Sequence, residues 1–356
     1  MKLSDVCTKG ASNIAQKDLD TRNGEYPIYG ASGFIKNVDF YHQENPYIAI
    51  VKDGAGVGRV MKLPAKSSVI GTMQYIIPNE GVSVEYLAYA LEHMNLSKYY
   101  LGAAIPHIYF KDYCNELLPN HTSEEQANIS HVLGLVSNLI FLRKQQLSKL
   151  DELVKSRFIE LFGDPESNPY GHPTKKLSDI ASYWNGLTYK PEDVQDQGTI
   201  VLRSSNIQNS QLDFADIVRV TCRIREKQYV QNNDILMCSR NGSAKLVGKV
   251  ALITNITEHM SFGAFMMIIR SDYYRYLMTY FQMDAFRNQI KTGATTTINQ
   301  ITGNMLNQVT LPVPDLSIVS QFATFIEQTD KSKFEIQKSL EKLETLKKAL
   351  MQQYFG

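Results

Sequence analysis

The sequence has few cysteines, almost no net charge and no long apolar run. Its four cysteines (Cys7, Cys114, Cys222 and Cys238) show neither CxxC pairing nor metal-ligand spacing. Four free thiols fit a reducing compartment, so we expect a cytoplasmic protein. The formal net charge of +1 gives no global basic field. DNA binding remains open, because it depends on a local patch or groove rather than on the summed charge.

Signals for export or membrane insertion are also missing. The N-terminal residues 1–10 lack the apolar segment of a signal peptide. No apolar run approaches the ~20 residues that a membrane span needs, so we expect no membrane contact. With 356 residues, of which 43% are hydrophobic and 10% aromatic, the chain can nevertheless form two or three domains with real cores.

What the sequence does have is one long stretch that occurs twice. Residues 123–163 and 316–356 are equally long and align without a gap. In both, apolar residues recur in steps of three and four, which predicts coiled-coil helices of about 60 Å at ~1.5 Å per residue. The pattern Ser123-x-x-Gln126 predicts a capping box, and both stretches end in Phe-Gly, a usual helix stop. The predicted seam consists of Val136, Ile140, Leu147, Leu150, Val154, Leu161, Ile336, Leu340, Leu343, Leu346, Leu350 and Tyr354.

The repeat extends over nearly the whole chain. Lys2–Val6 (KLSDV) recurs as Lys176–Ile180 (KLSDI). Further matching pairs, in chain order, are 47–51 with 234–238, 73–78 with 264–270, the Gly-Ala loop 102–105 with 293–296, and Leu118-Pro119 with Leu311-Pro312. A period near half the chain indicates a tandem duplication rather than a solenoid.

The duplication predicts an α+β fold with four parts. Two strand-rich domains, 1–120 and 164–314, are expected to be separated by two long helices, 121–163 and 315–356. Short apolar runs such as Tyr47–Val51, bounded by Gly, Asn and Pro, predict the strands. The second helix most easily returns antiparallel along the first, which predicts a pseudo-twofold internal repeat. Two heads on a rigid spacer can measure the distance between two targets, and B-DNA repeats every ~34 Å.

These motifs, in this order, carry a family resemblance. They are the KLSDV and KLSDI starts, the stretch 26–33 (YPIYGASG), its counterpart 201–207 (VLRSSNI), the Gly-Ala loops, the Leu-Pro pairs and the Phe-Gly helix ends. Together they resemble the specificity subunit of type I restriction–modification systems over nearly the full chain.

The resemblance implies a function as well as a fold. Each strand-rich unit would be a target-recognition domain for one half of a bipartite site in double-stranded DNA. The helices would set the spacer and dock two methyltransferase (modification) subunits, which in turn recruit restriction subunits. This chain would carry no catalytic chemistry and no cofactor; S-adenosylmethionine, ATP and magnesium would belong to the partners. The target bases, the spacer length and the existence of a restriction partner stay open.

Two alternatives from other classes remain. Asp53–Gly58, after an apolar strand, is similar to a glycine-rich cofactor turn and would suggest an S-adenosylmethionine-dependent methyltransferase. However, Arg59 stands where the third glycine would be, and residues 59–64 predict a strand rather than a helix. The other alternative is a two-headed scaffold that binds proteins. The seven histidines show no ligand spacing, so we expect neither a catalytic set nor a metal site.

DNA contacts call for Lys, Arg, amide and hydroxyl groups on turns beside strands. The two units are expected to recognise different half-sites, because their variable regions differ. In the first unit the candidates are Tyr29, Ser32, Lys36, Lys52, Arg59, Lys62 and His107. In the second they are Arg203, Ser204, Asn206, Arg240, Asn241, Ser243, Lys245, Thr296 and Asn299.

Overall fold

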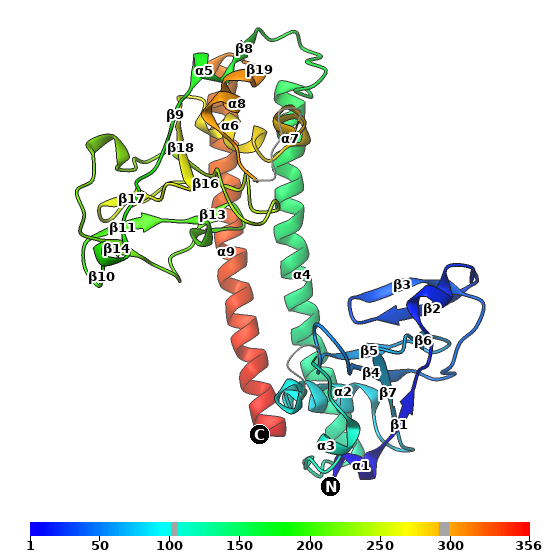
Figure 1. The fold of residues 1–356 in the computed structure, drawn as a ribbon. Coiled ribbons are helices and arrows are strands. Elements are labelled where there is room, and N and C mark those ends of the chain that lie inside the picture. The colour runs from blue at the N-terminus through cyan, green and yellow to red at the C-terminus, as the bar shows by residue number, and fades with distance from the viewer. Residues whose placement is uncertain (101–105, 292–298) are drawn as a thin grey trace. The chain divides into compact units, whose positions relative to one another are not determined.

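The computed structural model describes residues 1–100, 106–291 and 299–356, so both Gly-Ala loops lie outside the described residues (Figure 1). The chain divides into two compact units. Unit 1 comprises Met1–Gln146 with Ile336–Gly356, and unit 2 comprises Leu147–Glu335. Each unit therefore contains part of both long helices, and the two units are described in turn.

The two long helices are confirmed almost to the residue. Helix α4 spans Ser123–Phe162 and α9 spans Leu316–Phe355. Gly163 follows α4 with a φ of +75°, the left-handed conformation that ends a helix most readily at glycine. The capping box was predicted at Ser123 and Gln126, but the structure has it one residue earlier, at Thr122 and Glu125. Thr122 closes the capping box, because its Oγ1 accepts from Glu125 N at 3.3 Å while its own N donates to Glu125 Oε2 at 2.7 Å.

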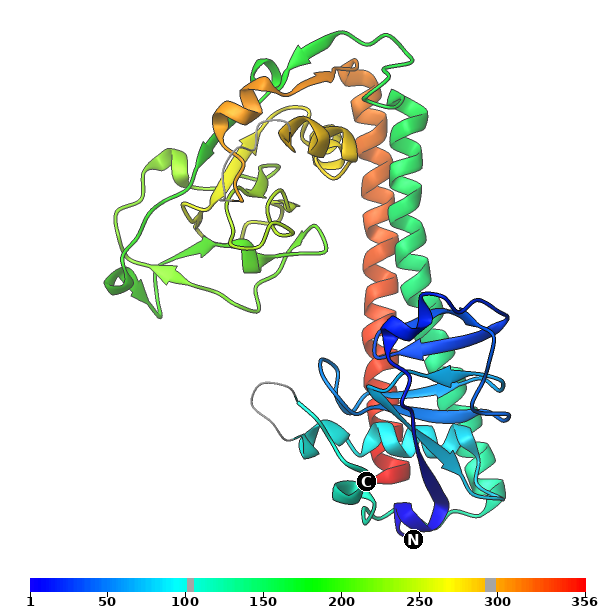
Figure 2. The ribbon, with the colours of Figure 1, turned by 45° about the vertical axis from the view of Figure 1, so that its right-hand side comes forward.

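The helices are antiparallel, as predicted (Figures 1 and 2). In unit 1 the first turns of α4, with Ile129 and Leu133, share a buried cluster with Met351 near the end of α9. In unit 2 the last turns of α4 meet the first part of α9, where the Phe158 and Phe322 rings lie 5.7 Å apart. The start of each helix thus packs near the end of the other.

One seam assignment was wrong. Leu346 is 46% exposed, whereas the other predicted seam residues are buried or half-buried. Along α9 the buried positions are spaced alternately by four and by three residues. Between Leu343 and Leu350 this spacing places Lys347 on the seam. The Lys347 stem lies against Tyr89, with Nζ 5.4 Å from the ring centroid, and Nζ ion-pairs with Glu92 at 3.2 Å.

Unit 1 is built on two sheets. The larger one has the antiparallel order β1 (Cys7–Ala11), β7 (Met73–Pro78), β4 (Tyr47–Val51), β5 (Val60–Leu63). The smaller has the order β3 (Gly33–Val38), β2 (Tyr26–Gly30), β6 (Ser68–Val69). The remaining elements are α1 (Leu3–Val6), α2 (Val84–His93), α3 (Phe110–Tyr113) and the 3-10 turns Gln16–Leu19 and Leu96–Tyr99.

A fully apolar strand explains the core of unit 1. Every residue of β4 is buried, and its Ile48 and Ile50 form one cluster with Leu87 and Leu91 of α2. Helix α2 begins at Ser83, whose Oγ accepts from Tyr86 N at 3.2 Å. The helix thereby covers one face of the larger sheet.

Unit 2 repeats this plan with more elements. Its larger sheet has the antiparallel order β16 (Val250–Leu252), β15 (Ile235–Cys238), β18 (Met266–Arg270), β9 (Ser182–Asn185). A second sheet has the order β10 (Val194–Gln195), β14 (Arg219–Val220), β11 (Thr199–Leu202), β17 (Met260–Phe262). The two-stranded pairs are β12 (Ile207–Gln208) with β13 (Gln211–Leu212), and β8 (Thr174–Lys176) with β19 (Thr310–Pro312). The helices are α5 (Leu177–Ile180), α6 (Tyr274–Tyr280), α7 (Asp284–Lys291) and α8 (Gly303–Gln308), with 3-10 turns at Pro191–Asp193, Ser204–Asn206 and Glu226–Gln228.

The topology confirms the duplication that the sequence predicts. The order β1-β7-β4-β5 in unit 1 matches β9-β18-β15-β16 in unit 2. The parallel pair β2 and β6 likewise matches the parallel pair β11 and β17. The repeated KLSDV and KLSDI starts form the same short helix, in which an Asp carboxylate accepts from a Lys backbone N–H, at 2.8 Å for Asp5 and 3.1 Å for Asp179. Among the described helices, none is long and apolar enough to cross a bilayer.

Candidate nucleic-acid interface

The two larger sheets carry the same loop at the same place. In unit 1 the loop follows β4 and closes with a bond of 2.8 Å from Gly58 N to Val51 O. In unit 2 it follows β15 and closes with a bond of 2.9 Å from Gly248 N to Cys238 O. The two glycines have φ values of +84° and +82°, which only glycine adopts at no steric cost. We call these two segments, residues 52–59 and 239–249, the edge loops.

A second segment lies beside each edge loop. In unit 1, Ile108 N donates to Lys52 O at 2.9 Å, and in unit 2, Ile301 N donates to Ser239 O at 2.7 Å. Single bridges add to this pairing, Asp53 with His107 and Arg240 with Gln300. The positions Asp53 and Arg240 are therefore equivalent in the repeated backbone, although one carries a carboxylate and the other a guanidinium.

In unit 1 the structure brings several predicted residues to this edge. Arg59 Nη1 donates to Ala31 O at 2.9 Å, which ties the edge loop to the tip of the β2–β3 hairpin. Ser32 lies in that tip, and Tyr29 lies just before it in β2. Lys52 and His107 lie on the paired segments just described. Arg59 and Ser32 are exposed, so they can meet a ligand.

Two other predicted residues of unit 1 have internal partners instead. Lys36 Nζ donates to Leu19 O at 3.0 Å and to Asn23 Oδ1 at 3.1 Å. Lys62 Nζ lies 3.1 Å from Glu85 Oε1 on α2. Neither lysine belongs to the group of residues at the edge loop.

In unit 2 the edge loop gathers most of the predicted residues. Asn241 Nδ2 donates to Ser204 Oγ at 3.2 Å, and Asn241 Oδ1 accepts from Ser243 N at 3.0 Å. Asn299 Nδ2 donates to Gly242 O at 3.2 Å. Arg240 and Lys245 are exposed on the same loop. Thr296, also predicted, lies outside the described residues.

The prediction for Asn206 needs correction. This residue is 1% exposed. Its Nδ2 donates to Asp213 O and Asp216 O at 2.8 and 2.9 Å, and its Oδ1 accepts from Arg203 N at 2.8 Å. With its amide fully used, it holds the 203–216 turn together and offers nothing to a base. Arg203 itself is ion-paired with Asp216 at 2.6 Å.

Sequence reasoning missed the exposed aromatic residues at these edges. Phe34 is 59% exposed beside Tyr29, and Tyr109 is 49% exposed beside His107. Phe265 is 58% exposed, and Arg240 Cζ lies 5.2 Å from its ring centroid. Proteins that bind single-stranded nucleic acid combine aromatic rings, on which bases stack, with nearby cations. These aromatic residues are visible in the sequence beside candidate strands. They were missed because an apolar residue next to a strand is normally assigned to the core.

The cofactor-like turn Asp53–Gly58 connects β4 to β5, which are antiparallel neighbours. A phosphate-binding turn would instead lead into a helix N-terminus. Gly54, Gly56 and Gly58 all have positive φ values, as a tight turn between strands requires. The methyltransferase alternative therefore loses its structural basis.

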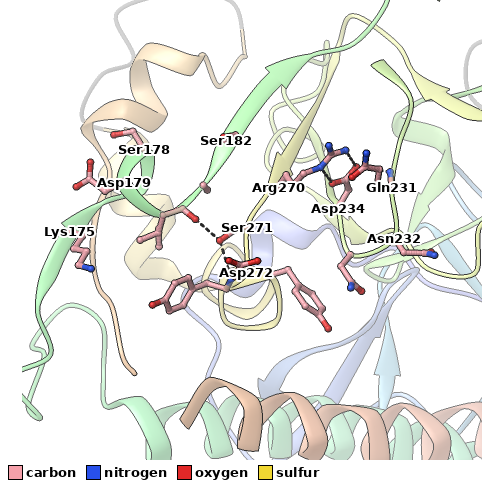
Figure 3. Close-up of a pocket in the computed structure, with 15 residues that line it drawn as sticks. Lys175, Ser178, Asp179, Ser182, Gln231, Asn232, Asp234, Arg270, Ser271 and Asp272 are labelled. Atoms are coloured by element: carbon pink, nitrogen blue, oxygen red, sulfur yellow. Dashed lines mark hydrogen bonds and ion pairs between the residues drawn. The ribbon is translucent and has the colours of Figure 1, made fainter. Parts of the chain in front are cut away.

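A polar cleft of about 700 Å³ lies elsewhere in unit 2 (Figure 3). Its buried carboxylate, Asp234, is paired with Arg270, and Ser271 Oγ donates to Ile180 O at 2.6 Å. These groups stabilise the fold. The Asp234–Arg270 pair joins the residue before β15 to the end of β18, and the Ser271 bond joins α5 to the segment before α6. Among the residues that the structure describes, no three His, Cys, Asp or Glu side chains are grouped to hold a metal ion.

These observations define a class of protein. It has a duplicated α+β framework, and each copy carries a polar edge of different chemistry. The family model for the type I restriction modification DNA specificity domain matches residues 1–152 and 171–348. The chain therefore belongs to this family.

Relatives agree with the family match. Over 196 residues the chain is 28% identical to the type I restriction enzyme StySPI specificity subunit of Salmonella potsdam, and 26% identical to the EcoKI specificity subunit of Escherichia coli (strain K12). Each alignment covers 51% of this chain and 42% of the relative, so the match spans less than half the length of these curated relatives.

Solved structures support the fold. The S subunit of the type I restriction–modification system from M. genitalium superposes with a TM-score of 0.61 at 14% identity, covering 100% of this chain and 95% of the other. A chain from a structure describing complex assembly and conformational transition of the type I R-M system gives a TM-score of 0.54 at 14% identity, with coverage of 100% and 96%.

Proposed function

We propose that this chain is the DNA-recognition subunit of a type I restriction–modification complex. Residues 1–120 and 164–314 would act as two target-recognition domains, each for one half of a bipartite site in double-stranded DNA. The observation that carries this proposal is the repeated edge loop, on which one backbone presents different side chains in the two units. A shared scaffold with different polar groups suits two half-sites of different sequence.

The chemistry of the edges supports recognition of DNA rather than of protein. Arg59 in unit 1 and Arg240 with Asn241 in unit 2 offer the groups that read base edges in the major groove. Hydroxyl groups such as that of Ser243 suit phosphate oxygens. A protein-binding scaffold would not need cations at both edges, nor the amides of Asn241 and Asn299 gathered at the edge of unit 2.

We further propose that the chain is non-catalytic and docks two methyltransferase subunits on its long helices. Helix α4 has a second apolar stripe outside the seam, where Leu135, Leu139 and Leu142 are 53%, 44% and 44% exposed. Their i, i+4, i+7 spacing suits a helical partner. S-adenosylmethionine would come with those subunits, and ATP and magnesium with restriction subunits. The complex would work in the cytoplasm, where its DNA is accessible.

Selection from a randomised duplex pool tests the DNA proposal. The full-length chain, alone and assembled with its methyltransferase subunits, is used to enrich duplexes, which are then sequenced. We expect two short specified segments at a constant separation, and an affinity that falls as salt rises because phosphate contacts release counterions. Enrichment of no sequence, or binding that is insensitive to salt, would contradict the proposal.

A heptad insertion tests whether the helices set the spacer. Lys144 Nζ and Glu344 Oε1 lie 2.9 Å apart and mark facing positions of α4 and α9 in unit 1. One heptad added at both positions keeps the seam in phase and lengthens it by about 10 Å, or about three base pairs. Both half-sites should persist at a longer separation. An unchanged separation would show that the helices do not measure it, and a heptad in α4 alone is the control that should disrupt the pairing.

A further inference from the structure

Arg240 and Phe265 form a pair at the edge loop of unit 2. The guanidinium Cζ lies 5.2 Å from the ring centroid, and the ring is 58% exposed. The two backbones are also joined, because Phe265 O accepts from Ser239 N, Arg240 N and Ser239 Oγ, each at 3.0 Å. The ring is thus held on a rigid turn next to the base of the Arg240 side chain, where it limits the orientations of the guanidinium.

The repeat shows that the fold does not need this pair. In unit 1 the bonds to Phe265 O have their counterpart in two bonds to Thr72 O, from Lys52 N at 3.0 Å and from Asp53 N at 3.2 Å. Thr72 therefore occupies the position of Phe265, and Asp53 that of Arg240. The same backbone forms with a hydroxyl and a carboxylate. An exposed ring and a cation in unit 2 hence serve something other than the framework.

Arg240 also differs from the arginines of unit 2 that form ion pairs. Arg203 is paired with Asp216 and Arg219 with Glu258, each at 2.6 Å. Within the described part of the chain, Arg240 has no carboxylate partner. Its five N–H donors are therefore available to a ligand, and the residue is exposed although the Phe265 ring lies beside its guanidinium.

We propose that Arg240, oriented by Phe265, recognises a guanine in the half-site of unit 2. This inference rests on the proposed DNA-recognition function and adds the base and the positioning residue. A planar guanidinium donates two parallel bonds to guanine O6 and N7, and that geometry is unique to guanine in the major groove. The contact with the ring restricts the guanidinium, so less rotational freedom is lost on binding.

The test uses duplexes carrying the selected site, in which each guanine is replaced in turn by 7-deazaguanine. This base pairs normally but lacks the N7 acceptor. Binding by the full-length chain in its complex should weaken at least about fivefold at one position of one half-site. For Arg240→Ala, the native and substituted duplexes should bind equally at that position. A guanine-free half-site, or an Arg240→Ala variant that weakens binding to all sequences equally, would overturn the inference.

Phe265→Thr introduces the residue that unit 1 has at the equivalent position. It should reduce the discrimination at the same guanine by about two- to fivefold and leave the other positions unchanged. Phe265→Tyr keeps an aromatic ring beside Arg240 and should retain the discrimination of the wild type. Unchanged discrimination in a folded Phe265→Thr protein would remove Phe265 from the role. Failure of the wild-type complex to select any duplex would instead contradict the proposed function itself, so the two failures are distinguishable.

Discussion

Asp234 Oδ1 accepts a hydrogen bond of 2.6 Å from Arg270 Nε, although Asp234 is only 1% exposed. The second carboxylate oxygen accepts from Arg270 Nη2 at 2.8 Å and from Gln231 N at 2.7 Å. The guanidinium in turn lies over Trp184, 5.0 Å from its ring centroid. The carboxylate is therefore fully satisfied, and it ties the turn before β15 to the end of β18.

Removing this carboxylate should destabilise unit 2. Asp234→Ala leaves Gln231 N and the Arg270 guanidinium without their acceptor, and we expect a loss of about 2–4 kcal/mol in the free energy of unfolding. Urea denaturation measures it. Asp272→Ala, an exposed change in the same cleft, is the control and should stay within about 0.5 kcal/mol. Equal effects of the two variants would show that the buried pair has no special weight.

The aromatic cluster below α6 gives a second stability prediction. Phe158 is fully buried, with its ring stacked on Tyr276 at 5.0 Å and 4.9 Å from Phe162. Phe158→Ala should cost about 3–5 kcal/mol, because it opens a cavity between α4 and α6. Phe334→Ala on α9, where the ring is 65% exposed, is the matched control with almost no expected cost. Similar midpoints for both variants in urea would refute this packing.

The phase of the seam can be tested with neighbouring residues. Lys347→Leu puts an apolar side chain on the seam and should raise stability by about 0.5–1.5 kcal/mol, because the added apolar burial outweighs the small contribution of the partly exposed pair with Glu92. Leu346→Lys changes a 46% exposed position and should stay within about 0.5 kcal/mol. Thermal melts of both variants suffice. A loss above ~2 kcal/mol in Leu346→Lys would restore Leu346 to the seam.

Unit 1 should lose stability in alkali. Burial, with a smaller contribution from Cys114, raises the pKa of the Cys7 thiol from 9.0 to about 12. Above pH ~9 the unfolded thiol is deprotonated while the folded one keeps its proton, so stability falls with pH, by at most ~1.4 kcal/mol per unit. The stabilisation is complete below pH 9 and is lost as the pH approaches 12.

Urea midpoints for wild type and Cys7→Ala, measured between pH 7 and 10, check this. A plot of the urea midpoint against pH should have the same slope for both proteins below pH 8.5. Above pH 9 the midpoint should fall less steeply with pH in Cys7→Ala than in the wild type. Burial also raises the pKa of Tyr47, so some slope should remain in the variant. An unchanged slope in Cys7→Ala would mean that the thiol is not shielded in the folded state.

The fold was largely predictable because its signals are long-range and repeated. Apolar periodicity followed by Phe-Gly located α4 and α9, and duplication of KLSDV located the second unit. Periodicity that counts only apolar residues could not find Lys347, because the alkyl stem of a lysine can lie on a seam while its ammonium group reaches solvent.

The candidate site was less predictable, since exposure is a property of the folded chain. Arg240, Asn241 and Asn299 were named as candidates one by one, and only the structure shows that they lie at the same edge loop. Their role in DNA binding stays a proposal. Asn206 was misassigned because an amide on a turn is equally suited to binding the backbone around it, as it does here. Phe265 was missed because its sequence gives no sign that the ring is exposed. Its exposure depends on how the rest of unit 2 folds around it.

The central claim is that the two units recognise separate halves of one DNA site. Duplex selection with full-length Arg59→Ala and Arg240→Ala, each in its complex, measures this most directly. The account predicts that Arg59→Ala relaxes specificity in one half-site only and Arg240→Ala in the other only, with the spacing unchanged. If both variants altered the same half-site, or if neither altered sequence preference, the account would be contradicted.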